Sequence, residues 1–377
     1  MDKYSKISTS RNAELDFWKF FAMIIIVIHH SNKIFEKERI YFPHGSIYVE
    51  FFFIVSGFLM ALSASKKPQG DLRSLGTETV SYIFRSIKRL MPYVVFGWIV
   101  TFISDLAYYG ADKVFTKENF LGLPFSVLLL QVSGMPMTEV IETDWYLSAM
   151  FLSMAVLYPL LRYRNDLFTK LIAPILAISL YAIMINVDGH IVGYTGWFAF
   201  FRKGFFRGIA GMSLGCSAFA VSRWLRGKFM YKGIPFLLSL VSIGCMVGSS
   251  VIMYYEIDGE YQGAVVVLFY IAVAVIASRK ASVNVIFQNS FSVKLGKLSM
   301  AVFLTHISLT RWLNLAIESS GALLDFRESE LGPPVLTAAF VVLSLILGAL
   351  CIAVTEPIQK KLKDFLKKEK QRQSAAE

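Results

Sequence analysis

The chain has 377 residues, of which 55% are hydrophobic and 15% aromatic, and its mean hydropathy is +0.55. Apolar runs of roughly 17–22 residues recur along it, each long enough as a helix to cross a hydrocarbon core of ~30 Å, and the ten-residue alternation of a β-barrel is not seen. A net charge of +11 would suggest nucleic-acid binding in a soluble protein, but basic loops beside a membrane explain it more simply, so no nucleic-acid partner is expected.

The first apolar run, at roughly 17–34, follows a basic N-terminus, as the core of a signal peptide would. It contains Lys19, His29 and His30 and lacks a cleavage site of small residues, so we interpret it as a retained helix. The stretch 119–133 is apolar but short, which favours a re-entrant or interfacial helix. The other candidate spans lie at roughly 47–64, 92–109, 145–161, 171–186, 204–222, 234–254, 262–278, 298–316 and 334–355.

The placement of Lys and Arg predicts the orientation of these spans. With the N-terminus inside, the inner segments hold 27 of the 38 basic residues and the outer segments hold 8. Because cytoplasmic loops carry the excess of positive charge, both termini are expected in the cytoplasm and the number of helices is expected to be even. The predicted fold is an all-α integral membrane protein with about ten transmembrane helices, located in the cell membrane and surrounded by lipid.

This prediction assigns residues 1–377 to a single membrane domain, with a helical bundle at about 14–357 and a basic cytoplasmic tail at 358–377. No metal site is expected, because the three cysteines all fall inside apolar runs, where they are interpreted as small buried residues. The sixth span contains Gly208, Gly211 and Gly215, a spacing of small residues that lets helices approach closely. Nothing points to a particular oligomeric state.

Ionisable residues inside membrane spans are costly and mark functional sites. Lys19 and His30 are eleven residues apart, so at about 100° per residue they lie within about 20° of one helix face and about 16 Å apart along the axis. Asp16 lies one turn before Lys19, close to that face, whereas His29 points about 100° away. The alternatives are a Lys19 that snorkels to the headgroups and a His30 anchored at the outer interface. Because Lys19 and His30 share one face of the helix, a functional interpretation is favoured over these alternatives.

This arrangement resembles the opening helix of the membrane acyltransferase-3 family, in which an Arg usually stands before a His with ten residues between them. Lys19 replaces that Arg, and Met150 stands where many relatives have Glu. The resemblance covers about 14–357, because five further motifs follow in the expected order. They are Val49-Glu-Phe-Phe-Phe-Ile-Val-Ser56-Gly57-Phe58, the basic turn Arg85-Ser-Ile-Lys88-Arg89-Leu-Met-Pro92, Trp145-Tyr-Leu-Ser-Ala-Met-Phe151, Leu295-Gly-Lys-Leu-Ser299-Met-Ala-Val-Phe-Leu-Thr-His306 and Glu356-Pro357.

The resemblance implies transfer of an acyl group, usually acetyl, from cytoplasmic acyl-CoA to a hydroxyl of a surface polysaccharide or lipid-linked glycan precursor. An alcohol that attacks a thioester needs a base, and neutral His suits that task near pH 7. The predicted catalytic residues are therefore His30, Lys19 and Asp16. A different function class, a transporter or flippase for a glycan or lipid, would also suit buried charges, and a covalently acylated product distinguishes the two.

The donor, acetyl-CoA, is expected to bind through its phosphates to Arg85, Lys88 and Arg89. The alternative is that these residues only follow the positive-inside rule. Four further residues are candidates for lining the cavity or the substrate site. They are His306, Ser56, Trp145 and Glu356.

The charged residues outside these motifs have less specific interpretations. Glu356 is expected to pair with a basic residue at the inner end of the last helix. Arg207 and Arg311 either face the interior or sit near the outer interface. Glu142 and Asp144 precede the fourth span on the outer side, where solvent exposure is the expected state.

Overall fold

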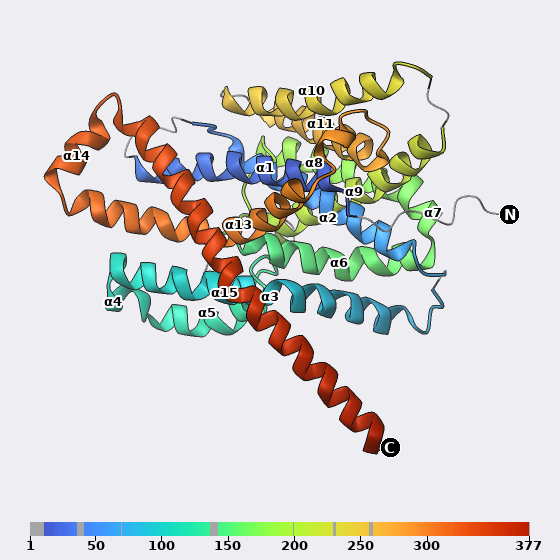
Figure 1. The fold of residues 1–377 in the computed structure, drawn as a ribbon, viewed down its shortest axis with the longest axis horizontal. Coiled ribbons are helices and arrows are strands. Elements are labelled where there is room, and N and C mark those ends of the chain that lie inside the picture. The colour runs from blue at the N-terminus through green and yellow to red at the C-terminus, as the bar shows by residue number, and fades with distance from the viewer. Residues whose placement is uncertain are drawn as a thin grey trace.

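The computed structural model describes residues 11–35, 41–68, 70–135, 142–198, 200–228, 231–255 and 259–376. Within these ranges the chain is a bundle of helices with one small hairpin, formed by β1 (Trp197–Phe198) and β2 (Phe201–Arg202), which pair antiparallel. Most of the long helices run roughly side by side along the horizontal direction of Figure 1.

Within the described part of the chain, ten long helices build the bundle. They are α1 (Ala13–Ser31), α2 (Tyr48–Ala64), α3 (Leu75–Tyr109), α6 (Trp145–Tyr163), α8 (Ala173–Asp188), α9 (Lys203–Gly227), α10 (Ile234–Tyr254), α11 (Gly259–Ser278), α13 (Ser290–Glu318) and α15 (Gly332–Ala376). The short elements are η1 (Asn32–Ile34), η2 (Gly45–Ile47), α4 (Ala111–Val114), α5 (Lys117–Val127), α7 (Asn165–Leu167), η3 (Phe168–Ile172), α12 (Asn284–Phe287) and α14 (Gly321–Glu328).

Among the described residues, nine helices are long and apolar enough to cross a membrane, and they include all of these long helices except α1. The exception carries Glu14, Asp16 and Lys19 in its first two turns. Helix α1 still has 19 residues, or about 29 Å at ~1.5 Å per residue, and it packs against α2, α13 and α15 inside the bundle. The all-α membrane architecture is therefore present, while the count of ten spans and the side of the termini stay predictions.

Two helices extend well beyond the predicted spans. Helix α3 begins at Leu75 rather than near 92, so Arg85, Lys88 and Arg89 lie on a continuous helix, and the expected turn before the third span was wrong. Helix α15 continues through the predicted tail to Ala376 and its end runs clear of the other helices, at the lower right of Figure 1. Hydropathy locates the part of a helix that crosses lipid. It does not detect polar turns that extend the helix beyond the lipid.

The apolar stretch 119–133 contains a short helix, as expected. Helix α5 has 11 residues, or about 16 Å, which is too short to cross a membrane. Beyond it the chain enters the bundle, since Leu129 and Val132 are buried. The backbone N–H of Val132 donates to Ser148 Oγ on α6 at 3.2 Å, and a Cβ on Gly204 of α9 would lie 2.8 Å from the Val132 side chain. This non-helical backbone is therefore held within the protein.

Helices α2 and α9 cross at backbone contact in the centre of the bundle. A Cβ on Gly57 would lie 2.0 Å from the carbonyl oxygen of Met212, and one on Gly215 would lie 2.0 Å from that of Ile54. A Cβ on Gly211 would meet Phe53 Cβ at 2.6 Å. The small residues of α9 thus serve close helix packing, as predicted.

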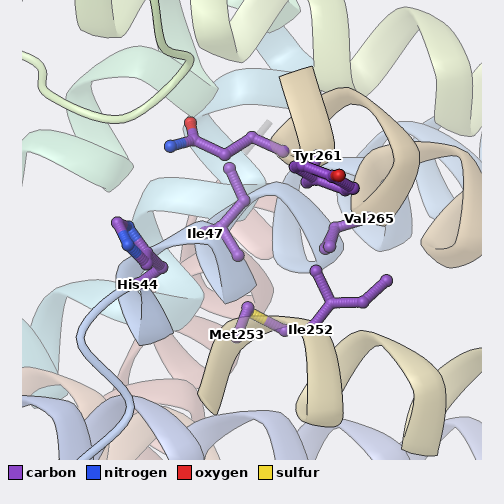
Figure 2. Close-up of a pocket in the computed structure, with 7 residues that line it drawn as sticks. His44, Ile47, Ile252, Met253, Tyr261 and Val265 are labelled. Atoms are coloured by element: carbon purple, nitrogen blue, oxygen red, sulfur yellow. The ribbon is translucent and has the colours of Figure 1, made fainter. Parts of the chain in front are cut away.

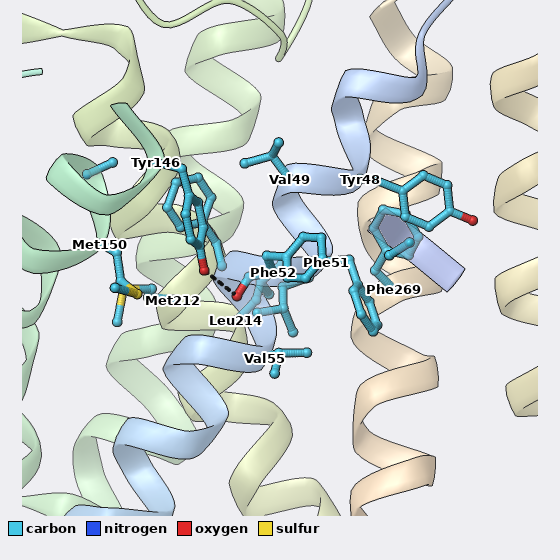
Figure 3. Close-up of a cluster of buried hydrophobic side chains, with 14 of the residues drawn as sticks. Tyr48, Val49, Phe51, Phe52, Val55, Tyr146, Met150, Met212, Leu214 and Phe269 are labelled. Atoms are coloured by element: carbon cyan, nitrogen blue, oxygen red, sulfur yellow. Dashed lines mark hydrogen bonds between the residues drawn. The ribbon is translucent and has the colours of Figure 1, made fainter. Parts of the chain in front are cut away.

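Aromatic side chains surround this crossing (Figure 3). The hydroxyl of Tyr146 on α6 donates to the carbonyl of Phe52 on α2 at 3.2 Å, and Phe51 packs on Phe269 of α11 with ring centroids 5.6 Å apart. The three cysteines are free and buried, in agreement with their interpretation as small core residues. They are Cys216, Cys245 and Cys351.

Candidate active site

The face of α1 that packs on α13 carries both Asp16 and His30. At one end of this interface Gly296 of α13 leaves room for Asp16, because a Cβ at Gly296 would lie only 2.4 Å from Asp16 Cβ. Farther along the same pair of helices, His30 meets His306. The Gly-x-x-Ser segment and the first helix are thus a single packing unit, and Asp16 and His30 share one side of α1, as helical phase predicts.

The two histidines are in hydrogen-bond contact. His306 Nε2 lies 3.1 Å from His30 Nδ1. His30 Nδ1 also lies 3.0 Å from the carbonyl oxygen of Ile26, and His306 Nδ1 lies 3.0 Å from that of Val302. His306 is fully buried and His30 is partly buried. Both residues were singled out from sequence, but their direct contact was not.

His29 has a different environment. Its Nδ1 lies 2.8 Å from the carbonyl oxygen of Phe42, and a Cβ on Gly45 would lie 2.7 Å from His29 Cβ. His29 therefore holds the segment that leads into α2. The residues after Phe42 also contribute to a small open pocket where α10 ends and α11 begins (Figure 2), lined by His44, Ile47, Ile252, Met253, Tyr261, Gln262 and Val265.

The charges at the start of α1 form a compact ion-paired group. Asp16 is 2% exposed and accepts from Arg11 and from Lys19, whose Nζ lies 2.5 Å from Asp16 Oδ1. The Lys19 side chain is only 19% exposed, so it is enclosed by protein and does not extend freely into the headgroups. The charge of Arg89 on α3 also acts on Lys19. Asp16 is consequently held as the partner of two cations.

The three basic residues predicted to bind the donor form an exposed face of α3. Arg85, Lys88 and Arg89 follow one another at i, i+3 and i+4, so they lie on one side of the helix. All three are exposed, and none of them is ion-paired within the described part of the chain. Arg89 of this face lies within electrostatic range of Lys19 at the start of α1.

Ser56 connects to the histidine pair through aromatic rings. Its Oγ lies 2.9 Å from the hydroxyl of Tyr146. The ring of Tyr146 is 5.6 Å from that of Phe303 on α13, and Phe303 is 6.2 Å from His306. The second, fourth and ninth predicted spans therefore meet in one internal region beside the two histidines.

Trp145 belongs to a buried charged cluster that was not predicted from the sequence. Arg207 Nε donates to Glu50 Oε1 at 2.6 Å, and both side chains are at most 2% exposed. The carboxylate of Glu50 also accepts from Tyr181. Trp145 lies under the Arg207 guanidinium at 4.8 Å and stacks on Tyr194 with ring centroids 4.8 Å apart. Glu50 was missed as a site residue, although a carboxylate inside an apolar run was a visible signal.

The charged residues around the beginning of α6 and the ends of α3 and α13 are also paired. Lys33 pairs with Glu142, and Arg311 of α13 pairs with Asp105 of α3, so Arg311 faces another helix. The expectation that Asp144 is exposed was wrong. Asp144 is 0% exposed and accepts from Trp98 Nε1 of α3 at 3.2 Å, because it sits at the start of α6, where α3 packs against it.

Glu356 lies apart from these contacts. Its Oε1 accepts from Lys297 Nζ of α13 at 3.0 Å, the pairing expected from sequence, and both side chains are more than 40% exposed. An exposed pair of this kind adds little stability. Among the described residues there is no group of three or more His, Cys, Asp and Glu side chains that could hold a metal ion.

Comparison with known proteins identifies one match. The family model described as an acyltransferase domain matches residues 12–353, which is nearly the whole bundle. No curated protein and no solved structure matches the chain.

Proposed function

The chain belongs to the membrane acyltransferase-3 family, and we propose that it transfers an acyl group, in the first instance acetyl, from cytoplasmic acyl-CoA to a hydroxyl of a surface polysaccharide or lipid-linked glycan precursor. The observation that supports this proposal most directly is the contact between His30 and His306 at the α1–α13 interface. Activation of an alcohol requires a base, and an imidazole held in place inside a membrane bundle is suited to that task.

In the proposed reaction His30 is the general base. It takes the proton of the acceptor hydroxyl while that oxygen attacks the thioester carbonyl carbon. The new C–O bond of the ester forms, the C–S bond breaks, and the proton held by His30 passes to the leaving sulfur of CoA. A positioned base of this kind contributes roughly 10²–10⁴ to the rate.

The donor is proposed to bind at the exposed basic face of α3. Arg85, Lys88 and Arg89 suit the phosphate groups of acyl-CoA, because exposed cations without carboxylate partners in the described chain are available to an anion. Lys19 lies within electrostatic range of Arg89 and about 16 Å along α1 from His30. A donor with its phosphates at α3 would therefore need to extend its acyl arm along α1 to reach the base.

The test compares surface glycans by mass in cells that lack the gene and carry one of three copies: the wild type, His30→Ala or His29→Ala. We expect the wild type to restore a mass shift of one acyl unit per modified residue. His30→Ala should reduce acylation by about 10²-fold or more, whereas His29→Ala should retain much of it, because His29 contacts the Phe42 carbonyl and lies outside the histidine pair.

Protein amount in the membrane is matched by immunoblot in all three strains. An active His30→Ala together with an inactive His29→Ala would refute the assignment of the base. Movement of the acceptor across the membrane without any change of its mass would instead support the transporter or flippase.

A further inference from the structure

The hydrogen bonds of the histidine pair determine which nitrogen carries each proton. A backbone carbonyl oxygen only accepts, so the 3.0 Å contact to Val302 requires a proton on His306 Nδ1. A neutral imidazole carries a single N–H, which leaves His306 Nε2 as an acceptor. His30 Nδ1 therefore faces two acceptors, the Ile26 carbonyl at 3.0 Å and His306 Nε2 at 3.1 Å.

We infer that His306 is a positioning residue that holds the proton of His30 on Nδ1 and so leaves His30 Nε2 as the basic nitrogen. The opposite tautomer of His30 would turn a lone pair toward both acceptors at once. The inference deepens the proposed function, since it names the atom that takes the hydroxyl proton.

The surroundings of His306 favour the neutral ring. Its side chain is fully buried, and the rings nearest to it are His30 at 5.0 Å, Phe303 at 6.2 Å and Phe340 at 6.4 Å. A cation in this setting would lose its hydration, and Glu142, the carboxylate whose charge reaches the ring, is already paired with Lys33, so a charged ring is strongly unfavourable. His306 is therefore neutral when its Nε2 accepts the hydrogen bond from His30.

Contacts at both ends of the α1–α13 interface keep His30 and His306 opposite each other. Toward the start of α1, Gly296 lies against Asp16. At the other end, Asn314 Nδ2 of α13 donates to the carbonyl oxygen of Lys33 at 3.1 Å. Because the two helices are joined on each side of the histidines, sliding or rotation of α1 that would separate the rings is opposed.

The arrangement gives His306 a definite part in the chemistry. When His30 Nε2 takes a proton, the ring becomes an imidazolium, and its Nδ1–H bond to His306 Nε2 becomes charge-assisted and stronger. His306 then has the place that a carboxylate has in a Ser-His-Asp triad, where the third residue sets the tautomer and stabilises the charged ring. A neutral third residue does this without another charge inside the membrane.

The first test uses three substitutions of His306 and measures kcat and KM for acetyl-CoA with protein in lipid vesicles. Gln can place its amide oxygen where His306 Nε2 stands, whereas Asn is too short and Ala has no acceptor. We expect His306→Ala and His306→Asn to lower kcat by roughly 10- to 100-fold with KM unchanged, and His306→Gln to stay within a few-fold of wild type. Equal losses in all three variants at equal protein amount would overturn the inference.

The second test observes the tautomer directly and is independent of activity. The protein is labelled with ¹⁵N-histidine and solubilised in detergent, and the His30 signals are identified by their loss in His30→Gln. We expect a protonated Nδ1 and a bare Nε2 in the wild type, and a mixture of tautomers in His306→Ala. A His30 protonated on Nε2 in the wild type would overturn the inference. The expected tautomer in a protein without acyl transfer would uphold the inference and refute the proposed function.

Discussion

At the scale of single residues, the most demanding feature is the ion pair between Glu50 and Arg207. Both groups lie in membrane-spanning helices and are almost completely buried, and each depends on the other to offset the loss of water. Tyr181 donates one more hydrogen bond to Glu50, and the carbonyl of Gly193 accepts from Arg207 Nη1 at 3.0 Å. Breaking such a pair leaves a buried charge without its counter-charge, which is much worse than removing both.

The first prediction follows from this imbalance. Arg207→Gln should lower the free energy of unfolding by about 3–5 kcal/mol, because the Glu50 carboxylate stays buried without a cation. The double variant Glu50→Gln/Arg207→Gln should lose less, since two neutral amides replace the pair. Thermal unfolding of purified protein in one detergent measures both variants. A double variant less stable than the single one would contradict this account.

Sequence singled out individual polar residues inside the apolar runs but not the residues that they contact. Lys19, His30 and His306 were recognisable because polar groups are rare in apolar runs. Helical phase placed Asp16 and His30 on one side of α1, but no local pattern states which helix faces that side. Glu50 gave the same kind of signal and was missed, and its pairing with Arg207 could not be predicted because the two residues are 157 positions apart. Asp144 was expected in solvent because it precedes the fourth span on the outer side, whereas it accepts a hydrogen bond from Trp98 of α3.

At the scale of elements, the crossing of α2 and α9 depends on glycine. The second prediction is that Gly215→Ala sharply reduces the folded yield, because the new methyl group would lie 2.0 Å from a backbone oxygen that has no room to move. Overpacking of this kind costs about 1–3 kcal/mol or more. Gly244→Ala in α10 is the matched control, since nothing lies within 4 Å of that position.

The yield of monodisperse protein after detergent extraction measures both variants. Gly244→Ala should match or exceed the wild type, because Ala is favoured over Gly within a helix by up to about 1 kcal/mol. Equal yields of the two variants would show that the crossing tolerates separation of its helices.

The third prediction concerns the basic face of α3. Arg85→Gln/Arg89→Gln should raise KM for acyl-CoA, because two cations available to phosphate are removed. The control Arg164→Gln/Lys170→Gln removes two exposed charges from a segment predicted on the same side of the membrane. Membrane accumulation should be similar in both double variants. An unchanged KM in Arg85→Gln/Arg89→Gln would mean that these residues only set the orientation of the chain in the membrane.

Sequence located every long helix of the described residues but misjudged where two of them begin or end. Apolar runs marked the positions at which helices cross lipid, and all ten runs coincide with helices of the structure. Helix α3 begins nearly five turns before its apolar run, and α15 continues past its own to Ala376. These prolongations are polar, so hydropathy had no signal for them.

At the scale of the whole molecule, the fourth prediction is the orientation of the bundle. The native cysteines are buried, so single cysteines introduced at exposed positions report on their own surroundings. With a membrane-impermeant maleimide, Glu330→Cys should be labelled in intact cells, whereas Lys66→Cys and Lys361→Cys should be labelled only after lysis. Labelling of Lys361→Cys before lysis would contradict an even number of spans.

The distance in sequence between Glu50 and Arg207 has a consequence for biogenesis. A ribosome that adds ~5–20 residues per second needs roughly 8 to 30 s to make the 157 residues that separate them. During this time α2 is in the membrane without the counter-charge of Glu50. A charged side chain in lipid costs a few kcal/mol. The arrival of α9 supplies the Arg207 counter-charge and lets the glycine crossing close. A nascent chain that stops before α9 keeps an exposed carboxyl in the bilayer, a chemical mark by which the cell can distinguish unfinished copies from finished ones.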